Sequence, residues 1–215
     1  MSRDVITRQV VVTGRVTDAI TSGAPRGLLA VAALDDSDGE PFPGLAVRIL
    51  PDGHYAVHGN PAVMLPETPA TLRIEASVAG YDDETATVSF TAAQLTRIDR
   101  PLDVGGVVDT ARVIDDLPRE AHIALQPRPV SIRGRVSEAE DPGTPIAGAS
   151  ISITAPVALG PVASDADGFF TIGPAPVAQT VTLLADAAGR QSLSTDIVLD
   201  FASPTNRVSL PLEPI

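Results

Sequence analysis

The side chains that most resemble catalytic or metal-binding groups in this sequence are its three histidines. His54 and His58 are four residues apart, a spacing that on a helix would put both imidazoles on one face and suit a zinc ion. They follow Asp52-Gly53 in a stretch expected to be a strand, where four residues span about 13 Å, too far for one ion. The sequence predicts no acidic or histidine partner for His122. We therefore expect all three histidines to be structural or surface residues.

Two acidic stretches, Asp35–Glu40 and Asp165–Gly168, each contain the D-x-D-G pattern with which a calcium loop begins. A complete loop supplies further oxygen ligands and ends in a bidentate Glu at position twelve, and neither stretch continues in that way. Turns in which Asp caps the backbone and Gly supplies a positive φ explain the same residues. Calcium held by ligands that converge from several loops stays an open alternative.

Motifs for covalent and phosphate chemistry are absent from the sequence. There is no Cys, no G-x-S-x-G elbow and no H-E-x-x-H zinc motif. Gly105-Gly106 lacks the Lys and Ser/Thr that follow the glycines of a phosphate-binding loop. The sequence therefore predicts that the protein is not an enzyme, and it assigns no catalytic, cofactor-binding or metal-binding residue.

The charge composition narrows the classes of partner. The net charge is −12, and all 15 positive residues are Arg, since the sequence has no Lys. This acidity argues against nucleic acid and anionic membranes, which both bind basic surfaces. There is no apolar run of about 18 residues, so no membrane insertion is expected. Residues 1–12 lack the apolar core of a signal peptide, so we expect a cytoplasmic protein as synthesised, or one released within a particle.

Four blocks of sequence recur in the same order in the two halves of the chain. Gly-containing strand starts, Asp-Gly turns and alternating apolar segments match in pairs: Val12–Val16 with Ile132–Val136, Pro51–Val57 with Ala166–Ile172, Thr71–Gly80 with Thr180–Gly189, and Ile123–Pro129 with Val208–Pro214. We interpret them as two copies of one domain, 1–128 and 129–215, joined by the proline-stiffened linker Gln126–Val130.

Short alternating segments between Pro/Gly turns predict an all-β fold of two tandem seven-stranded, immunoglobulin-like sandwiches. The first copy is expected to have strands near 10–17, 28–34, 45–50, 54–58, 71–79, 84–90 and 121–126. The second is expected to have strands near 130–137, 149–154, 157–163, 168–172, 180–186, 192–199 and 207–211.

The copies differ mainly in an insert at residues 91–121 of the first domain. Thr91-Ala-Ala-Gln94 has capping-box spacing and predicts a short helix through Ile98. Long loops in small domains are usually functional, so this insert is a candidate segment for contacting a partner. The alternative is that its apolar residues cover an open edge of the sandwich.

The second copy resembles the carboxypeptidase regulatory-like domains, which have a transthyretin-like fold. Their pattern G-x-V, P-x-x-G-A, D-x-x-G-x-F is matched by Gly134-Arg-Val136, Pro145-Ile-Ala-Gly-Ala149 and Asp165-Ala-Asp-Gly-Phe-Phe170. The zinc ligands of the accompanying carboxypeptidase and the Tyr-Arg-Gly-Ser signature of transthyretin-like hydrolases are absent. The Lys-dependent isopeptide bond of similar adhesin repeats is impossible without Lys. The resemblance implies a non-catalytic module.

The function expected from these observations is a structural or adaptor module that makes protein–protein contacts in a larger assembly. By analogy with the family, one concrete setting for that assembly is a phage-tail-like contractile injection particle. The alternative is a carbohydrate-binding accessory module. Sugar sites favour exposed aromatic residues, however, and aromatic residues of all kinds make up only 3% of this chain.

The absence of a complete metal site gives a first prediction. Dialysis against a chelator should leave the melting temperature unchanged, because neither D-x-D-G stretch supplies a full set of ligands. A drop of several degrees that calcium reverses would contradict this and assign Asp36, Asp38, Asp165 and Asp167 as ligands.

Overall fold

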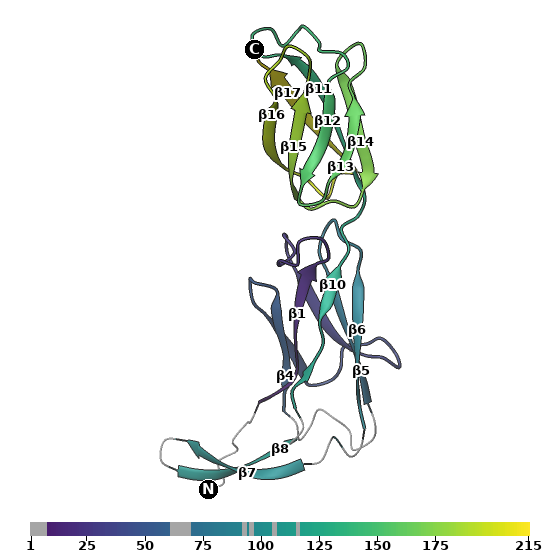
Figure 1. Ribbon diagram of the computed structural model, residues 1–215. Helices are drawn as coiled ribbons and strands as arrows, with labels where there is room; N and C mark the ends of the chain where they lie inside the picture. The colour runs from purple at the N-terminus through teal and green to yellow at the C-terminus, as the bar shows by residue number, and fades with distance from the viewer. Residues whose placement is uncertain (1–7, 61–69, 92–93, 95–96, 105–106, 115–116) are drawn as a thin grey trace. The chain divides into compact units, whose positions relative to one another are not determined.

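The computed structural model describes residues 8–60, 70–91, 94, 97–104, 107–114 and 117–215, and the regular secondary structure of these residues is almost entirely β-strand (Figure 1). They form two compact units. The first comprises Met1–Thr17, Gly23–Val78 and Asp83–Leu125, and the second comprises Asp18–Ser22, Ala79–Asp82 and Gln126–Ile215. The predicted all-β fold of β-sandwich type is thus confirmed.

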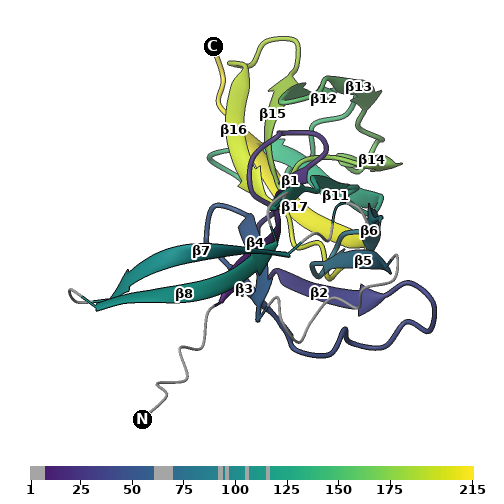
Figure 2. The same ribbon diagram turned by 90° about the horizontal axis from the view of Figure 1, so that it is seen from below.

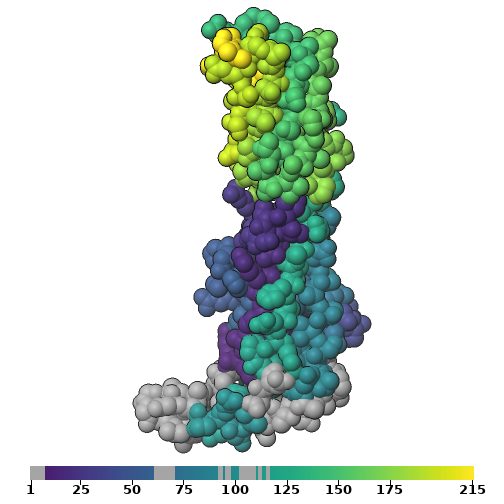
Figure 3. Space-filling view, in the orientation of Figure 1, coloured from purple at the N-terminus to yellow at the C-terminus, as the bar shows by residue number. Residues whose placement is uncertain are grey.

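The first unit has two main sheets. One has the order β10-β1-β4-β3 with β9 also paired to β1, and the other has the order β2-β5-β6. Figure 3 shows β1 in purple beside β10 in teal on the surface of this unit. The strands are β1 (Gln9–Asp18), β2 (Ala30–Asp35), β3 (Leu45–Ile49), β4 (His54–Gly59), β5 (Ala70–Ser77), β6 (Glu84–Phe90), β9 (Arg119–Glu120) and β10 (Ile123–Leu125).

The second unit also has two sheets, in the orders β14-β11-β17 and β13-β12-β15-β16. Inward-facing residues such as Ile132, Ile151, Leu183 and Leu210 are fully buried, so the core lies between the sheets. The strands are β11 (Val130–Glu138), β12 (Ser150–Ala155), β13 (Leu159–Ala163), β14 (Phe169–Ala175), β15 (Thr180–Asp186), β16 (Leu193–Val198) and β17 (Thr205–Leu212).

The two units share their strand pairing except at the third strand. β3 pairs with β4, whereas its counterpart β13 pairs with β12 in the opposite sheet. In both units this strand lies at an edge. The edge position suits β13 because it contains Pro161, which has no backbone N–H for a second neighbour. Every strand predicted from the sequence has a counterpart within a few residues, so these predictions are confirmed.

The insert at residues 91–121 contains a β-hairpin that the sequence analysis missed. β7 (Arg97–Val104) and β8 (Val107–Ile114) pair along their whole lengths and form a twisted antiparallel ribbon (Figure 2). The predicted helix cannot extend through Ile98, because strand β7 begins at Arg97, and residues 92–93 and 95–96 of that prediction lie outside the described residues. At the base of the hairpin, the Gln9 side chain donates to the Ile114 carbonyl at 2.6 Å and accepts from the Ile114 N–H at 2.9 Å.

A glycine on the first strand of each unit faces an aromatic ring of the neighbouring strand. A Cβ on Gly14 would lie 2.6 Å from the Tyr55 ring, and one on Gly134 would lie 2.5 Å from the Phe170 ring. Both distances are well below van der Waals contact, so only glycine fits there. The Tyr55 hydroxyl also donates a buried hydrogen bond of 2.6 Å to the Ala121 carbonyl.

The Asp-Gly turn before the fourth strand also repeats. The backbone N–H of Val16 donates to the Gly53 carbonyl at 2.9 Å, and that of Val136 donates to the Gly168 carbonyl at 2.8 Å. The two glycines have φ of +85° and +78°. A Cβ on either would overlap the carbonyl oxygen of the same valine, so the turn requires glycine twice over.

We predict that Gly168→Ala lowers the free energy of unfolding by about 2–4 kcal/mol, because strain at positive φ and overlap with Val136 act together. Gly148→Ala is the matched control. Its φ is +68° but nothing lies within 4 Å of its added Cβ, so strain alone should cost about 1 kcal/mol. Urea unfolding measures both values, and equal losses would contradict the overlap.

A third prediction concerns Tyr55, since burial raises the pKa of its phenol to about 12 from the ordinary 10.0. The unfolded chain ionises first, so stability falls as pH rises from about 10 towards 12. Tyr55→Phe should cost about 1–3 kcal/mol at neutral pH, because it leaves the buried Ala121 carbonyl unpaired. The difference between the native protein and the variant should then shrink above about pH 10. A constant difference in urea unfolding across this range would show that the phenol does not titrate as proposed.

Candidate functional site

Each unit has a shallow depression at the same place, on the outer side of the sheet that contains its first strand. The depression of the second unit has a volume of about 500 Å³, and that of the first about 620 Å³. We call the surface of the second unit the arginine face, made of Arg133, Arg135, Phe169, Thr171 and Arg207. We call the other the histidine face, made of Thr13, Arg48, His54, Glu120 and His122.

The arginine face is assembled by three neighbouring strands. Strand β11 pairs in parallel with β17, which sets Arg133 directly opposite Arg207. On its other side β11 pairs with β14, which sets Arg135 opposite Phe169. Because side chains alternate along a strand, burial of Ile132 and Val136 on the inner side directs both arginines of β11 outward.

Arg135 is held in one orientation by backbone carbonyls. Its Nε donates to Asp167 at 3.1 Å, Nη1 to Pro142 at 3.2 Å and Nη2 to Gly143 at 2.9 Å. Its guanidinium also lies over the Phe169 ring, 5.8 Å from the ring centre. No carboxylate of the described residues forms an ion pair with it, so its charge is oriented without being neutralised.

Arg133 and Arg207 have neither a hydrogen-bonding side-chain partner nor an ion pair among the described parts of the chain. This differs from Arg190 in the same unit, whose Nε donates to Glu138 at 2.9 Å and whose guanidinium pKa is raised by that hydrogen bond. Like charges opposite each other on adjacent strands destabilise a sheet. The arginine face thus keeps an unfavourable pair that an external anion would relieve.

Phe169 is the exposed aromatic residue of this face, with 55% of its surface accessible. The other aromatic side chains are buried in the two cores: Phe42, Tyr55, Tyr81, Phe90, Phe170 and Phe201. One exposed ring beside three guanidinium groups suits contact with a mixed apolar and anionic surface.

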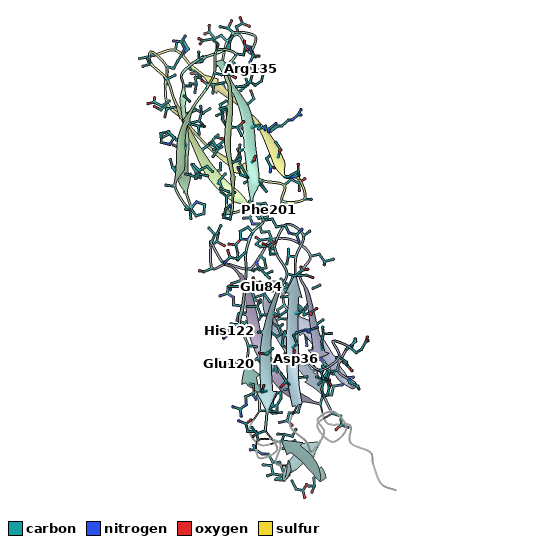
Figure 4. The ribbon with its side chains drawn as sticks, turned by 90° about the vertical axis from the view of Figure 1, so that its right-hand side faces the viewer. Asp36, Glu84, Glu120, His122, Arg135 and Phe201 are labelled. Atoms are coloured by element: carbon teal, nitrogen blue, oxygen red, sulfur yellow. The ribbon has the colours of Figure 1, made fainter. Side chains whose placement is uncertain are left out.

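The histidine face has a different chemical character. His54 Nδ1 lies 2.9 Å from the Asp52 carboxylate, and this hydrogen bond lowers the pKa of Asp52. His122 Nε2 lies 3.7 Å from the Glu120 carboxylate, and Figure 4 shows the two residues next to each other. His122 Nδ1 accepts a hydrogen bond from the Arg15 N–H at 3.2 Å. The expectation that His122 lacks an acidic partner is therefore wrong: Glu120 is only two residues away, across the end of β9.

His54 and His122 line one depression, but His58 does not. Within the residues described, no three or more His, Cys, Asp or Glu side chains are arranged to hold a metal ion. Separately, none of the helices in that part of the chain is long and apolar enough to cross a membrane.

Both D-x-D-G stretches form turns in which carboxylates cap the backbone. Asp35 Oδ1 accepts from the Ser37 hydroxyl at 2.7 Å and from its N–H at 2.9 Å, and the hydroxyl bond is the main cause of its lowered pKa. Asp38 Oδ1 accepts from the Glu40 N–H at 2.9 Å. Asp165 Oδ1 accepts from the N–H groups of Asp167 and Phe169 at 3.0 and 2.8 Å. These geometries support the interpretation as Asp-capped turns.

The solved structures with similar folds have low identity to this chain. The Bacillus anthracis TIE protein has 10% identity and a TM-score of 0.41, and the match covers 96% of this chain and 34% of that one. A streptococcal ancillary pilin has 12% identity and a TM-score of 0.32, with 100% and 64% covered. A C-terminal fragment of the pilus adhesin SpaC from Lactobacillus rhamnosus GG has 13% identity and a TM-score of 0.34, with 94% and 98% covered. The chain thus spans about a third of the first protein and under two thirds of the second.

A comparison with curated proteins found no match. A comparison with protein families matches residues 131–213, which form nearly the whole of the second sandwich, to the carboxypeptidase regulatory-like domain. The resemblance indicated by Gly134-Arg-Val136 and the Asp165–Phe170 turn is confirmed for this segment by that match.

Proposed function

We propose that this protein is a non-catalytic structural or adaptor module that binds a protein partner through its arginine face. The observation that carries the proposal is the pair Arg133 and Arg207, set opposite each other without an acidic partner among the described residues. Such a pair costs stability in the isolated protein, and an acidic partner surface would compensate for it. The first unit is proposed to be a divergent copy of the same domain.

The setting proposed for this module is a multiprotein particle, for which a contractile injection particle is one concrete form. Support for the carbohydrate-binding alternative is limited to Phe169, because the other described aromatic side chains are buried and cannot stack on a sugar ring. The insert hairpin β7–β8 is a second candidate contact, anchored to β1 through Gln9.

The proposal is tested by replacing the native chain in its source cells with the double variant Arg133→Glu/Arg207→Glu. The native chain should sediment with a particle much larger than itself, and the variant should stay in the unassembled fraction because its face repels the partner. Arg48→Glu is the matched control, since Arg48 is an exposed arginine of the histidine face, and it should assemble normally. Circular dichroism checks that each variant is folded.

Assembly of the folded double variant at the native level would contradict the proposal, as would a native chain that never joins a larger particle. Mass spectrometry of the co-sedimenting proteins identifies the setting: sheath and baseplate components support an injection particle. Binding of the native chain to a polysaccharide that Arg133→Glu/Arg207→Glu does not weaken would favour the carbohydrate-binding alternative away from this face.

A further inference from the structure

We propose that the arginine face binds an extended protein segment that carries carboxylates at alternate positions, with an apolar side chain beside them. This inference rests on the proposed function, because it names the chemistry of the partner that docks on this face.

The spacing of the arginines follows from the sheet. Arg133 and Arg135 are two residues apart on β11 and point to the same side, so their Cα atoms are about 6.7 Å apart. Carboxylates at positions i and i+2 of an extended segment have the same separation. Arg207 lies on the adjacent strand, about 4.8 Å from Arg133. An extended segment therefore brings one carboxylate to Arg133 and Arg207 and the next to Arg135.

The donors needed for these contacts are available. An arginine has five N–H donors, and Arg135 uses three of them on backbone carbonyls, which leaves two for a ligand. Those carbonyls also fix its direction before binding, which reduces the entropy lost on association. Arg133 and Arg207 keep their side-chain donors unused within the described chain, and two guanidinium groups can share one carboxylate through charge-assisted hydrogen bonds.

The rest of the face fixes what lies beside the carboxylates. Phe169 is opposite Arg135 on β14 and 55% exposed, so an apolar side chain on the same side of the segment as the carboxylates, two residues beyond them, can cover its ring. The histidine face of the first unit provides a contrast at the equivalent place. There Asp52 and Glu120 accompany the two histidines and would repel a carboxylate. We therefore expect one binding site per chain, on the second unit.

A second copy of this chain also offers carboxylates at alternate positions, at Asp36, Asp38 and Glu40. In that stretch, however, Asp38 caps the Glu40 N–H and the backbone is bent into a turn. An extended segment of another protein fits the row of arginines better than this turn does. Self-association is accordingly one of the outcomes that the test must separate.

The test uses the full chain and two fluorescent peptides of identical composition. The alternating peptide has Glu at alternate positions and Val two residues beyond the last Glu, so that these side chains share one side, and the other peptide has its Glu residues consecutive. Fluorescence anisotropy at low salt should show one alternating peptide bound per chain, at least about tenfold more tightly than the consecutive one. Arg133→Gln/Arg207→Gln should weaken binding by about tenfold or more, Arg48→Gln should leave it unchanged, and added salt should weaken it.

Several outcomes would overturn the inference. These are equal affinity for the two peptides, undiminished binding by the folded Arg133→Gln/Arg207→Gln variant, or equal binding of a single-stranded oligonucleotide of matched charge. Concentration-dependent dimers of the native chain that this variant abolishes would assign the face to the turn of a second copy instead. If neither peptide binds but the arginine pair is still needed for assembly, this inference fails and the proposed function stands.

Discussion

The close packing of a bare glycine against an aromatic ring determines the geometry of the first strand in both units. Gly14 lies under Tyr55 and Gly134 under Phe170, and in each case an added Cβ would overlap the ring. The ring fills the interior space that a side chain would otherwise occupy, and it fixes which side of the strand faces the core. A register shift by one residue would turn the flanking side chains inward, so this packing also specifies what the outer surface displays.

Because the inner side is constrained in this way, the outer side is free to differ between the two units. The residues before the glycine are Thr13 in one unit and Arg133 in the other, and the residue after it is Arg in both. One scaffold thus presents a face with two histidines paired to carboxylates and another with three arginines that no carboxylate of the described residues neutralises. The two faces differ in side chains that the core does not constrain. A difference in partner between the two units would therefore arise from these faces.

The main strands could be predicted from the sequence because apolar and polar residues alternate along them and because their glycine and Asp-Gly markers recur in both halves. The insert was harder to interpret. Thr91 does donate its N–H to the Gln94 side chain at 2.9 Å, as a capping box requires, but one local hydrogen bond does not carry a helix as far as Ile98, which lies in strand β7. Gly105-Gly106 was the signal for a two-residue hairpin connection. The parallel pairing of β11 with β17, which brings Arg207 beside Arg133, depends on long-range register that no local pattern encodes.

For the proposed binding of an acidic partner, the net charge of −12 would make the arginine face more selective than it would be on a neutral protein. At physiological salt a charge is screened beyond about 8 Å, so distant carboxylates of this chain barely affect a ligand already seated on the face. The three arginines lie within about that distance of one another, by the spacing of adjacent strands and of alternate residues, and so act together. A partner that misses this row meets an acidic surface and is repelled, whereas one aligned with it gains several charge-assisted hydrogen bonds at once. The excess of acidic residues therefore works against misplaced acidic partners and leaves the aligned contact nearly unaffected.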